Sequence, residues 1–317
     1  MNHISMFGGE GNWYKGNLHC HSTDSDGKLS PSEVAELYKK SWWNFLAFTD
    51  HKIFSDYEKF NDRSFLILPA AELDTHKLDP VRIYHVLGIT GRDKHAANSF
   101  AHGELFESPV WNGLKSAQGI IDQIITRNAH AIFCHPNWSR LEFEDFRDLN
   151  GFFAMEIYNH CAEVESHTGI SIDYWDSLLR RGRKIWGVAT DDAHHHLKDQ
   201  CGGWVMVRAS CLSHESIMEA LLDGCFYSSN GPEIYHYGIK DGVVYVECSP
   251  VRAIHFVTYE LHGCSYWGAD EGTINSASYK LKGSEKYVRV ECVDKQGHTA
   301  WSNPIFLENT LCKEQSL

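Results

Sequence analysis

The sequence predicts an α/β fold in which a closed barrel of strands and helices is followed by a small antiparallel β-sandwich. Short apolar strands alternate with amphipathic helices over residues 1–230. Such alternation implies parallel strands that are buried on both faces. Polar residues follow nearly every strand, and only a closed barrel brings that many strand ends to one point. Residues 231–317 show short strands and turns without a helical period, which favours an antiparallel sandwich.

The composition is that of an ordinary soluble globular protein. The 317 residues, 43% hydrophobic and 22% charged, suffice for a large core and two domains. A net charge of -13 disfavours long nucleic acid as a partner, because no basic surplus is present. The ten cysteines form no C-x-x-C pair and are expected to be reduced. Without a signal sequence or a long apolar run, we expect a cytoplasmic protein that does not enter membranes; its oligomeric state stays open.

The first strand of the predicted barrel, residues 13–18, leads into a His-x-His pair. Side chains alternate along a strand, so His19 and His21 point the same way and can bind one metal ion from one side. Asp26 follows in a Ser-Asp-Gly turn, from which its carboxylate can face back over the strand end. For such a pair taken alone, two solvated loop histidines remain the simpler interpretation.

The next elements follow in an order typical of repeated strand–helix units. Ser30 is predicted as the N-cap of a helix, Pro31 as its first residue and Glu33 as the partner that completes a capping box. Further helices are predicted at 114–128, 143–149, 171–181 and 213–223. Further strands are predicted at 45–48, 65–71, 82–89 with His85 in its middle, 131–134, 152–158, 185–189 and 204–208.

The character of the sequence changes after Gly231-Pro232. Residues 234–239 and 243–246 alternate around Asp241-Gly242, which is typical of a two-residue hairpin turn. We therefore expect a barrel domain over residues 1–230 and a β-sandwich accessory domain over 231–317. Its other strands are predicted at 256–261, 278–281, 287–293 and 300–307.

Histidine and acidic residues stand at the ends of the predicted barrel strands. Each of them alone has a simple structural explanation, such as a helix cap, a solvated acid or a buried, hydrogen-bonded histidine. Together they exceed the usual four ligands of one zinc site and suit a cluster of two or three divalent metals, with Zn, Mn or Fe as candidates. The candidate ligands are His19, His21, Asp26, His51, Glu72, His85, His135, Asp192 and His194.

These residues belong to seven short motifs that follow one another along the chain. The motifs are His19-x-His21-Ser22, Ser25-Asp26-Gly27, Thr49-Asp50-His51, Ala70-Ala71-Glu72, His85-Val86-Leu87-Gly88, His135-Pro136 and Asp192-Ala193-His194. In this order they resemble the PHP (polymerase and histidinol phosphatase) family over roughly residues 13–230. The resemblance implies a distorted (β/α)7 TIM-like barrel with a trinuclear metal centre that hydrolyses phosphoesters.

The resemblance also implies a role for each ligand. It assigns His19, His21, Glu72 and Asp192 to one metal, Glu72, His85 and His135 to a second with Glu72 bridging, and Asp26, His51 and His194 to a third. Glu72, Asp192 and His194 are thereby expected to be catalytic. A water that bridges two cations loses its proton near neutral pH, so a metal-bridged hydroxide is the expected nucleophile.

Two features bear on the branch of the family. Asp26 stands where some members have histidine, which resembles the branch that hydrolyses AMP and 3′,5′-bisphosphates. That branch carries a larger insert before its His-Pro motif than the roughly fifty residues between His85 and His135. Nucleotide specificity therefore stays open. The β-rich tail resembles an accessory domain found behind some bacterial PHP barrels.

A basic side chain is expected to bind the phosphate. Lys52 directly follows His51, and Arg140 lies just after the His-Pro motif, so these two are the best placed. No Gly-x-Ser-x-Gly elbow and no glycine-rich phosphate loop occurs in the sequence. Four further residues are expected at the same rim, where one binds substrate or protonates the leaving alkoxide: Asn159, His160, His195 and His196.

The sequence therefore predicts a metal-dependent phosphoesterase, foremost a phosphomonoesterase for a small phosphorylated substrate such as a nucleotide or a sugar phosphate. An amidohydrolase-type hydrolase is an alternative, since those barrels also begin with His-x-His. The Thr-Asp-His motif and Glu72, at a place where a bridging lysine would otherwise stand, count against it. A non-catalytic metal-binding or interaction module is a further alternative. The presence of all nine candidate ligands disfavours a non-catalytic module without metal, because buried polar groups that bind no metal would destabilise the fold.

Overall fold

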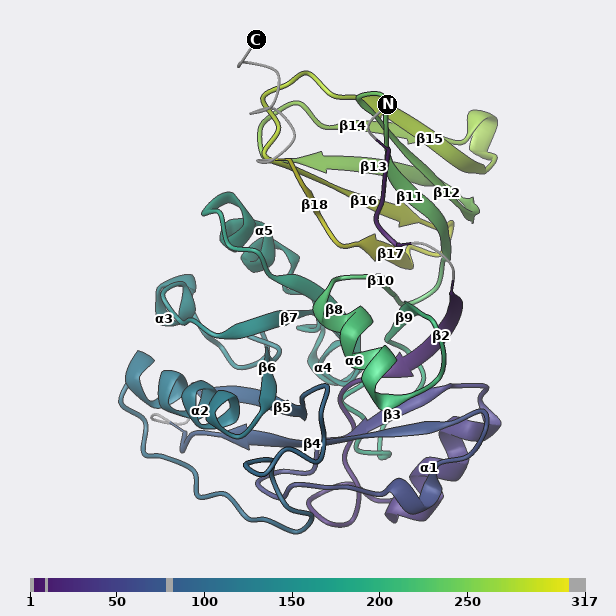
Figure 1. Cartoon of the computed structure of the whole chain (residues 1–317). Coiled ribbons are helices and arrows are strands. Elements are labelled where there is room, and N and C mark those ends of the chain that lie inside the picture. The colour runs from purple at the N-terminus through teal and green to yellow at the C-terminus, as the bar shows by residue number, and fades with distance from the viewer. Residues whose placement is uncertain (1–2, 9–10, 78–81, 308–317) are drawn as a thin grey trace.

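The computed structural model describes residues 3–8, 11–77 and 82–307 and combines a mixed α/β part with a separate small antiparallel sheet (Figure 1). The helices of the α/β part are α1 (Pro31–Lys40), α2 (Leu114–Thr126), α3 (Phe143–Phe146), α4 (His160–Ser166), α5 (Ile172–Arg180) and α6 (His214–Leu222). Its strands are β2 (Asn12–Asn17), β3 (Phe45–Phe48), β4 (Leu66–Asp74), β5 (His85–Thr90), β6 (Ala129–Phe133), β7 (Phe152–Asn159), β8 (Trp186–Thr190), β9 (Trp204–Ala209) and β10 (Phe226–Ser229). None of the described helices is long and apolar enough to cross a membrane.

The strands of the α/β part pair in the order β10-β9-β2-β3-β4-β5-β6-β7-β8. The predicted parallel pairing holds within β2-β3-β4 and within β6-β7-β8. It is wrong for β5, which runs antiparallel to β4 and β6, and for β9, which runs antiparallel to β2. Strands β8 and β9 lie close together, but no ladder is described between them. Closure of the barrel therefore stays a prediction.

The direction of β5 follows from the connection that precedes it. A parallel neighbour of β4 needs a crossover of a dozen or more residues, usually helical. Only residues 75–84 separate β4 from β5, and no helix is described among them. The strand also begins at His85, so the prediction that His85 lies in mid-strand is wrong. Asp74 and His85 face each other across this antiparallel pair, which brings the start of β5 to the carboxyl end of β4.

The start of helix α1 confirms the predicted cap. The Ser30 hydroxyl accepts a hydrogen bond from the main-chain N–H of Glu33, whose carboxylate accepts one from the N–H of Ser30. Pro31 is the first helical residue. These contacts satisfy main-chain donors that a helix start otherwise leaves unpaired. Tyr38 on the buried face donates a hydrogen bond to Asp191 (2.7 Å), which ties this helix to the residues that follow β8.

The C-terminal strands form two antiparallel sheets around a common core. The strands outside the α/β part are β1 (His3–Ser5), β11 (Ile234–Lys240), β12 (Val243–Val251), β13 (Ala253–Thr258), β14 (Cys264–Trp267), β15 (Ile274–Lys280), β16 (Tyr287–Val293), β17 (Thr299–Ser302) and β18 (Ile305–Phe306). The four-stranded sheet has the order β1-β11-β12-β15, and its buried valines pack with Ile254 and Phe256 of β13 and with the buried valines of β16. Asp241 and Gly242 both have positive φ, which confirms the predicted hairpin turn.

The two parts of the chain are joined in more than one place. Strand β10 pairs with β17, so the large sheet continues from the α/β part into the C-terminal strands (Figure 1). Strand β1, near the N-terminus, pairs with β11 of the small sheet. Arg289 of β16 is almost fully buried and donates two hydrogen bonds of 2.9 Å to Asp176 of α5. The domain limits 1–230 and 231–317 stay predictions, and these contacts cross them.

Candidate metal centre

All nine candidate ligands lie at one end of the α/β part. They lie close to the carboxyl ends of β2, β3, β4, β6 and β8, except His85, which opens β5. Because β5 is antiparallel to its neighbours, its first residue reaches the same end of the sheet. The structure forms several groups of histidine and acidic side chains whose nitrogen and oxygen atoms lie within 4.8 Å of one another. These groups are placed to hold more than one metal ion.

The first group joins the His-x-His pair to two acids. Nε2 of His19 lies 3.1 Å from Oδ1 of Asp192 and 3.3 Å from Oε2 of Glu72. Nε2 of His21 lies 3.0 Å and 3.4 Å from the same two oxygens. The two Nε2 atoms are 3.2 Å apart. Two imidazole nitrogens and two carboxylate oxygens thus face one another, and they belong to the four residues that the resemblance assigns to one metal.

Glu72 lies at the middle of the cluster and uses both of its oxygens. Oε1 is 2.7 Å from Nδ1 of His85 and 3.5 Å from Nε2 of His135. Oε2 faces the His-x-His pair and also lies 3.2 Å from Nδ1 of His51. The two oxygens of one carboxylate therefore serve different groups, which is the geometry expected of a bridging ligand.

A third group gathers around Asp26 at the open side. Its two oxygens lie 3.5 Å from Nε2 of His194 and 3.7 Å from Nε2 of His51. The ring of His194 stacks on that of His21, with ring centroids 4.2 Å apart. Asp26 is the most exposed of these acids, with 55% of its side chain accessible. This group therefore lies nearer to solvent than the first.

Protein groups behind the histidines fix the direction of their rings. Nδ1–H of His19 donates to Glu156 (2.7 Å), and Nδ1–H of His194 donates to the main-chain oxygen of Asp192 (2.8 Å). Nδ1 of His135 lies 3.1 Å from the Ser139 hydroxyl. In all three rings Nε2 is thereby left to face the centre. Contacts of this kind orient metal-binding histidines.

The segment that follows β8 is folded around two buried carboxylates. Asp191 accepts hydrogen bonds of 2.8 Å from the main-chain N–H groups of Cys201, Gly202 and Gly203. Asp199 accepts from the main-chain N–H groups of His194 (2.8 Å) and His195 (3.1 Å). Asp192, which lies between the two, has a left-handed backbone with φ of 54°. Such a strained residue persists only where its surroundings determine its conformation.

The acids and histidines of the cluster shift one another's pKa values. Burial favours the uncharged forms, yet the neighbouring histidines lower the pKa of Glu72 and of Asp192 well below the usual range. The same carboxylates overcome burial and raise the pKa of His19 well above its usual value. His51 behaves differently, because burial dominates and lowers its pKa to about 3. Without metal, the charges of these carboxylates and of His19 thus stabilise each other, whereas the neutral form of His51 is favoured.

A cavity of about 230 Å³ opens above the ligands. Its wall contains the ligands Asp26, His51, Glu72, His85, His135, Asp192 and His194 together with Trp138, Cys161, Ala162, Glu165 and His196. No lysine or arginine is among these lining residues.

Neither the two residues predicted to bind phosphate, Lys52 and Arg140, nor the predicted rim residues Asn159 and His160 line this cavity. Nζ of Lys52 lies 3.7 Å from Asp74, and Arg140 is exposed. Asn159 is fully buried and donates to Glu156 and to Asp192, at 3.0 Å each. Nδ1 of His160 lies 2.9 Å from the Tyr158 hydroxyl.

Sequence reasoning missed the buried Glu156. It lies in β7 within an apolar run and belongs to none of the seven motifs, although an acid inside such a strand is itself a signal. Of the additional rim histidines predicted from the sequence, His196 lines the cavity and His195 does not.

The residues present fit a metal cluster. Imidazole and carboxylate donors suit Zn, Mn and Fe, and the grouped ligands exceed what one ion needs. Nδ1 of His51 is buried and has no hydrogen-bond partner, although it faces a carboxylate. A buried nitrogen of this kind is costly unless a proton or a metal ion occupies it.

Three solved structures to which the chain is similar share 14–15% sequence identity with it. No protein-family model and no curated protein matches it. A two-domain protein containing a predicted PHP-like metal-dependent phosphoesterase from Bacteroides vulgatus aligns with TM-score 0.46 and 14% identity, over 93% of this chain and 96% of that one. A proposed metal-dependent phosphoesterase from Bifidobacterium adolescentis aligns with TM-score 0.40 and 14% identity, over 56% and 87%. An amidohydrolase from Chromobacterium violaceum aligns with TM-score 0.36 and 15% identity, over the same shares.

Proposed function

We propose that this chain is a PHP-type metal-dependent phosphoesterase that hydrolyses a small phosphomonoester. The observation that carries the proposal is the position of Glu72, whose two oxygens face different groups of ligands. Clusters of divalent cations held by carboxylates and imidazoles are suited to phosphoryl transfer, because that reaction depends on positioning and on charge neutralisation. The seven motifs of the sequence support the same assignment.

The ligands divide among three proposed sites. His19, His21, Glu72 and Asp192 would hold one cation, Glu72, His85 and His135 a second, and Asp26, His51 and His194 a third. When bound, such cations polarise a phosphoryl oxygen and make water acidic enough to attack at neutral pH. Zn, Mn and Fe are the candidates that the donor types favour.

The wall of the cavity supports a small substrate whose phosphoryl group is held by the metal centre. No lysine or arginine lines the wall, so its side chains offer no cation other than histidine to the phosphoryl oxygens. The volume of about 230 Å³ lies below the roughly 300–1,000 Å³ of pockets that enclose drug-sized ligands. An amidohydrolase-type centre would use a bridging lysine. No lysine is among the residues that line this cavity.

His196 is the side chain we propose as proton donor to the leaving alkoxide. It lines the cavity without belonging to the proposed ligand set. Its Nδ1 lies 3.8 Å from Asp199, the carboxylate around which the preceding residues fold. An imidazole placed beside a leaving group can donate a proton in the transition state.

Phosphate release by metal-reconstituted protein tests the proposed function. The substrates would be AMP, a 3′,5′-bisphosphate, histidinol phosphate, a sugar phosphate, a phosphotyrosine peptide and an aryl phosphate. Turnover of at least one of them, lost in the Asp192→Asn variant, is the expected result. If no substrate releases phosphate although metals are demonstrably bound, the phosphomonoesterase assignment is overturned. That result would favour a phosphodiester or non-phosphate substrate.

A further inference from the structure

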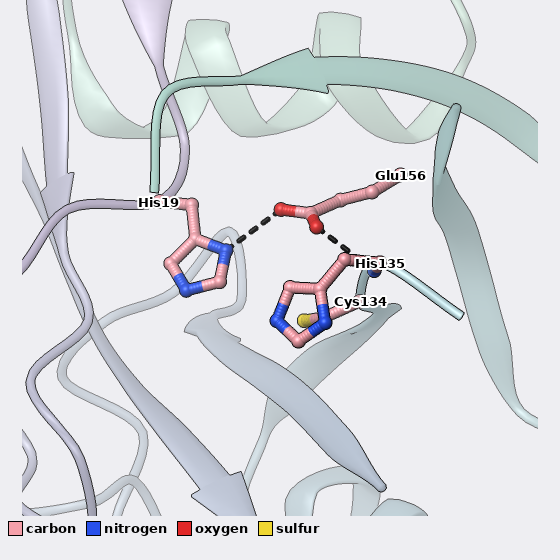
Figure 2. A group of neighbouring side chains, drawn as sticks. All are labelled: His19, Cys134, His135 and Glu156. Carbon is pink, nitrogen blue, oxygen red and sulfur yellow. Dashed lines mark hydrogen bonds and ion pairs between the residues drawn. The ribbon is translucent and has the colours of Figure 1, made fainter. Parts of the chain in front are cut away.

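Glu156 lies behind the ligand cluster and accepts four hydrogen bonds. The residue is 1% exposed and belongs to β7. Oε1 accepts from Nδ1–H of His19 (2.7 Å) and from the Thr190 hydroxyl (2.7 Å). Oε2 accepts from the main-chain N–H of His135 (2.9 Å) and from the Asn159 amide (3.0 Å). Figure 2 shows the carboxylate between the two histidines, with one oxygen directed to each.

We infer that Glu156 is a positioning residue that holds ligands of two different metal ions in their binding geometry. The inference rests on the proposed metal centre and adds to it a residue outside the nine ligands. Glu156 would act through His19 and His135, because it is not among the residues that line the cavity above the proposed ligands.

The contact with His19 determines which ring nitrogen binds metal. A carboxylate accepts hydrogen bonds and donates none, so Nδ1 of His19 must carry a proton. Nε2 is then the nitrogen with a free lone pair once the ring is neutral, and it faces Asp192 and Glu72. A carboxylate behind a ligating histidine also makes the ring a stronger ligand.

The contact with His135 holds a backbone conformation that is otherwise unfavourable. His135 has φ of 22°, a region that residues with a side chain rarely adopt. Its main-chain N–H is tied to Glu156, and its Nδ1 lies against Ser139. Nε2 of His135 is thereby directed at Glu72 and Asp192.

Asn159 extends the same arrangement to a third ligand. The Nδ2 group of Asn159 donates to Glu156 and also to Oδ2 of Asp192, each at 3.0 Å. Its Oδ1 accepts from the main-chain N–H of Ala162 at the start of α4, which fixes the amide orientation. One carboxylate thus connects His19, His135 and Asp192 by direct or single-step hydrogen bonds.

The Glu156→Gln variant tests this inference. Glutamine has nearly the same shape but places an NH2 group where one carboxylate oxygen stood, so that two of the four donors lose their acceptor in either orientation. We expect the affinity for at least one Zn or Mn ion, measured by calorimetric titration of metal-free protein, to fall about 10- to 100-fold. A carboxylate that only stabilises the core would change the thermal unfolding midpoint and leave the affinity unchanged.

Glu285→Gln is the matched control. Glu285 is also buried (2% exposed) and accepts hydrogen bonds from Tyr279 and from main-chain N–H groups, but it lies among the C-terminal strands. We expect this variant to bind metal as the wild type does. Wild-type affinity and stoichiometry in Glu156→Gln would overturn the inference. Wild-type protein that binds no metal would instead overturn the proposed function.

A second measurement avoids dependence on folding of the variant. In zinc-loaded wild-type protein, long-range proton–nitrogen NMR spectra distinguish the two ring nitrogens of each histidine. We expect a proton on Nδ1 of His19 and metal on its Nε2. Metal on Nδ1 of His19 would overturn the inference even if the Glu156→Gln variant does not fold.

Discussion

Oδ1 of Asp192 lies 3.0 Å from Nε2 of His21, although the two residues are 171 positions apart in the chain. The backbone itself makes this contact possible. Cys20 pairs with Ala193 in a parallel bridge, the N–H of His21 donates to the oxygen of Ala193, and the N–H of Asp192 donates to the oxygen of His19. The first and last ligand motifs are thereby held side by side before any metal binds.

Replacement of Asp192 by asparagine should abolish turnover while the protein stays folded. Asparagine keeps the shape but removes the charge that faces His19 and His21. We expect kcat to fall by at least about 100-fold, since even residues behind the ligands contribute 10- to 100-fold. Phosphate release and circular dichroism measure the two properties. Asp173→Asn, at an exposed residue of α5, is the control and should keep activity. An unchanged kcat in Asp192→Asn would show that Asp192 is not part of the site.

Metal affinity should rise with pH. The pKa values of His19, His21 and His135 are raised in the metal-free protein, because nearby carboxylates overcome the effect of burial. A histidine with a raised pKa holds its proton to a higher pH, and this proton must leave before the nitrogen can bind metal. We therefore expect proton release on metal binding, detected by calorimetry in buffers of different ionisation enthalpy. Affinity that does not change between about pH 6 and pH 8 would contradict this.

Replacement of His196 by glutamine should slow the hydrolysis of substrates with poor leaving groups more than that of substrates with good ones. A proton donor matters most for an alkoxide and least for the more stable anion of an aryl phosphate. We expect kcat for an alkyl phosphate to fall by about 10²- to 10⁴-fold, with a much smaller loss for the aryl phosphate. His167→Gln, a change at an exposed residue, is the control. Equal losses for both substrates would mean that His196 does not protonate the leaving group.

Glu165 should disfavour substrates that carry a second phosphate group. It lines the cavity and accepts a hydrogen bond from the Trp138 indole (3.0 Å), and no cation is described beside it. A like charge about 4 Å away costs about 1 kcal/mol in water, or roughly fivefold. We expect Glu165→Gln to raise kcat/KM for a bisphosphate by about that factor relative to a monophosphate. The hydrogen bond to Trp138 can persist, since the glutamine oxygen also accepts. An unchanged ratio would show that this carboxylate does not face the substrate.

Arg289 should stabilise the chain without supporting the metal centre. Its guanidinium is buried between Asp176 and Glu291 and lies over the ring of Trp175. Removal of one partner from a buried ion pair leaves an unpaired buried charge and costs about 3–5 kcal/mol. We expect Arg289→Met to lower the free energy of unfolding by about that amount in denaturant titrations, with metal content unchanged. Arg252→Met, at an exposed residue between β12 and β13, should have a small effect. Loss of bound metal in the Arg289→Met variant would contradict the expectation that Arg289 does not support the metal centre.

The sequence predicted the ligand cluster better than the residues around it. Ligands sit in short motifs, and the end of a strand can be located from the apolar run that precedes it. Side-chain direction beyond a strand end is harder to predict, because it depends on tertiary contacts. Lys52 follows a ligand in the chain, yet it points to Asp74 rather than into the cavity. Glu156 belongs to no motif, so only the folded structure shows that it contacts His19.

Local signals predicted single elements well and strand direction poorly. The capping box of α1 and the Asp241-Gly242 turn depend on neighbouring residues alone, and both are confirmed. The direction of β5 follows from the connection to β4, because the ten residues 75–84 are fewer than a parallel crossover needs. The apolar run itself does not indicate the direction, because parallel and antiparallel strands that are buried on both faces have similar apolar sequences.

Elemental analysis of the metal-reconstituted wild-type protein tests the central claim most directly. The claim is that the nine ligands hold a cluster rather than a single ion. After incubation with Zn, Mn or Fe and removal of free metal, we expect two to three tightly bound metal ions per chain. One ion or none per chain, under every reconstitution condition, would contradict the cluster.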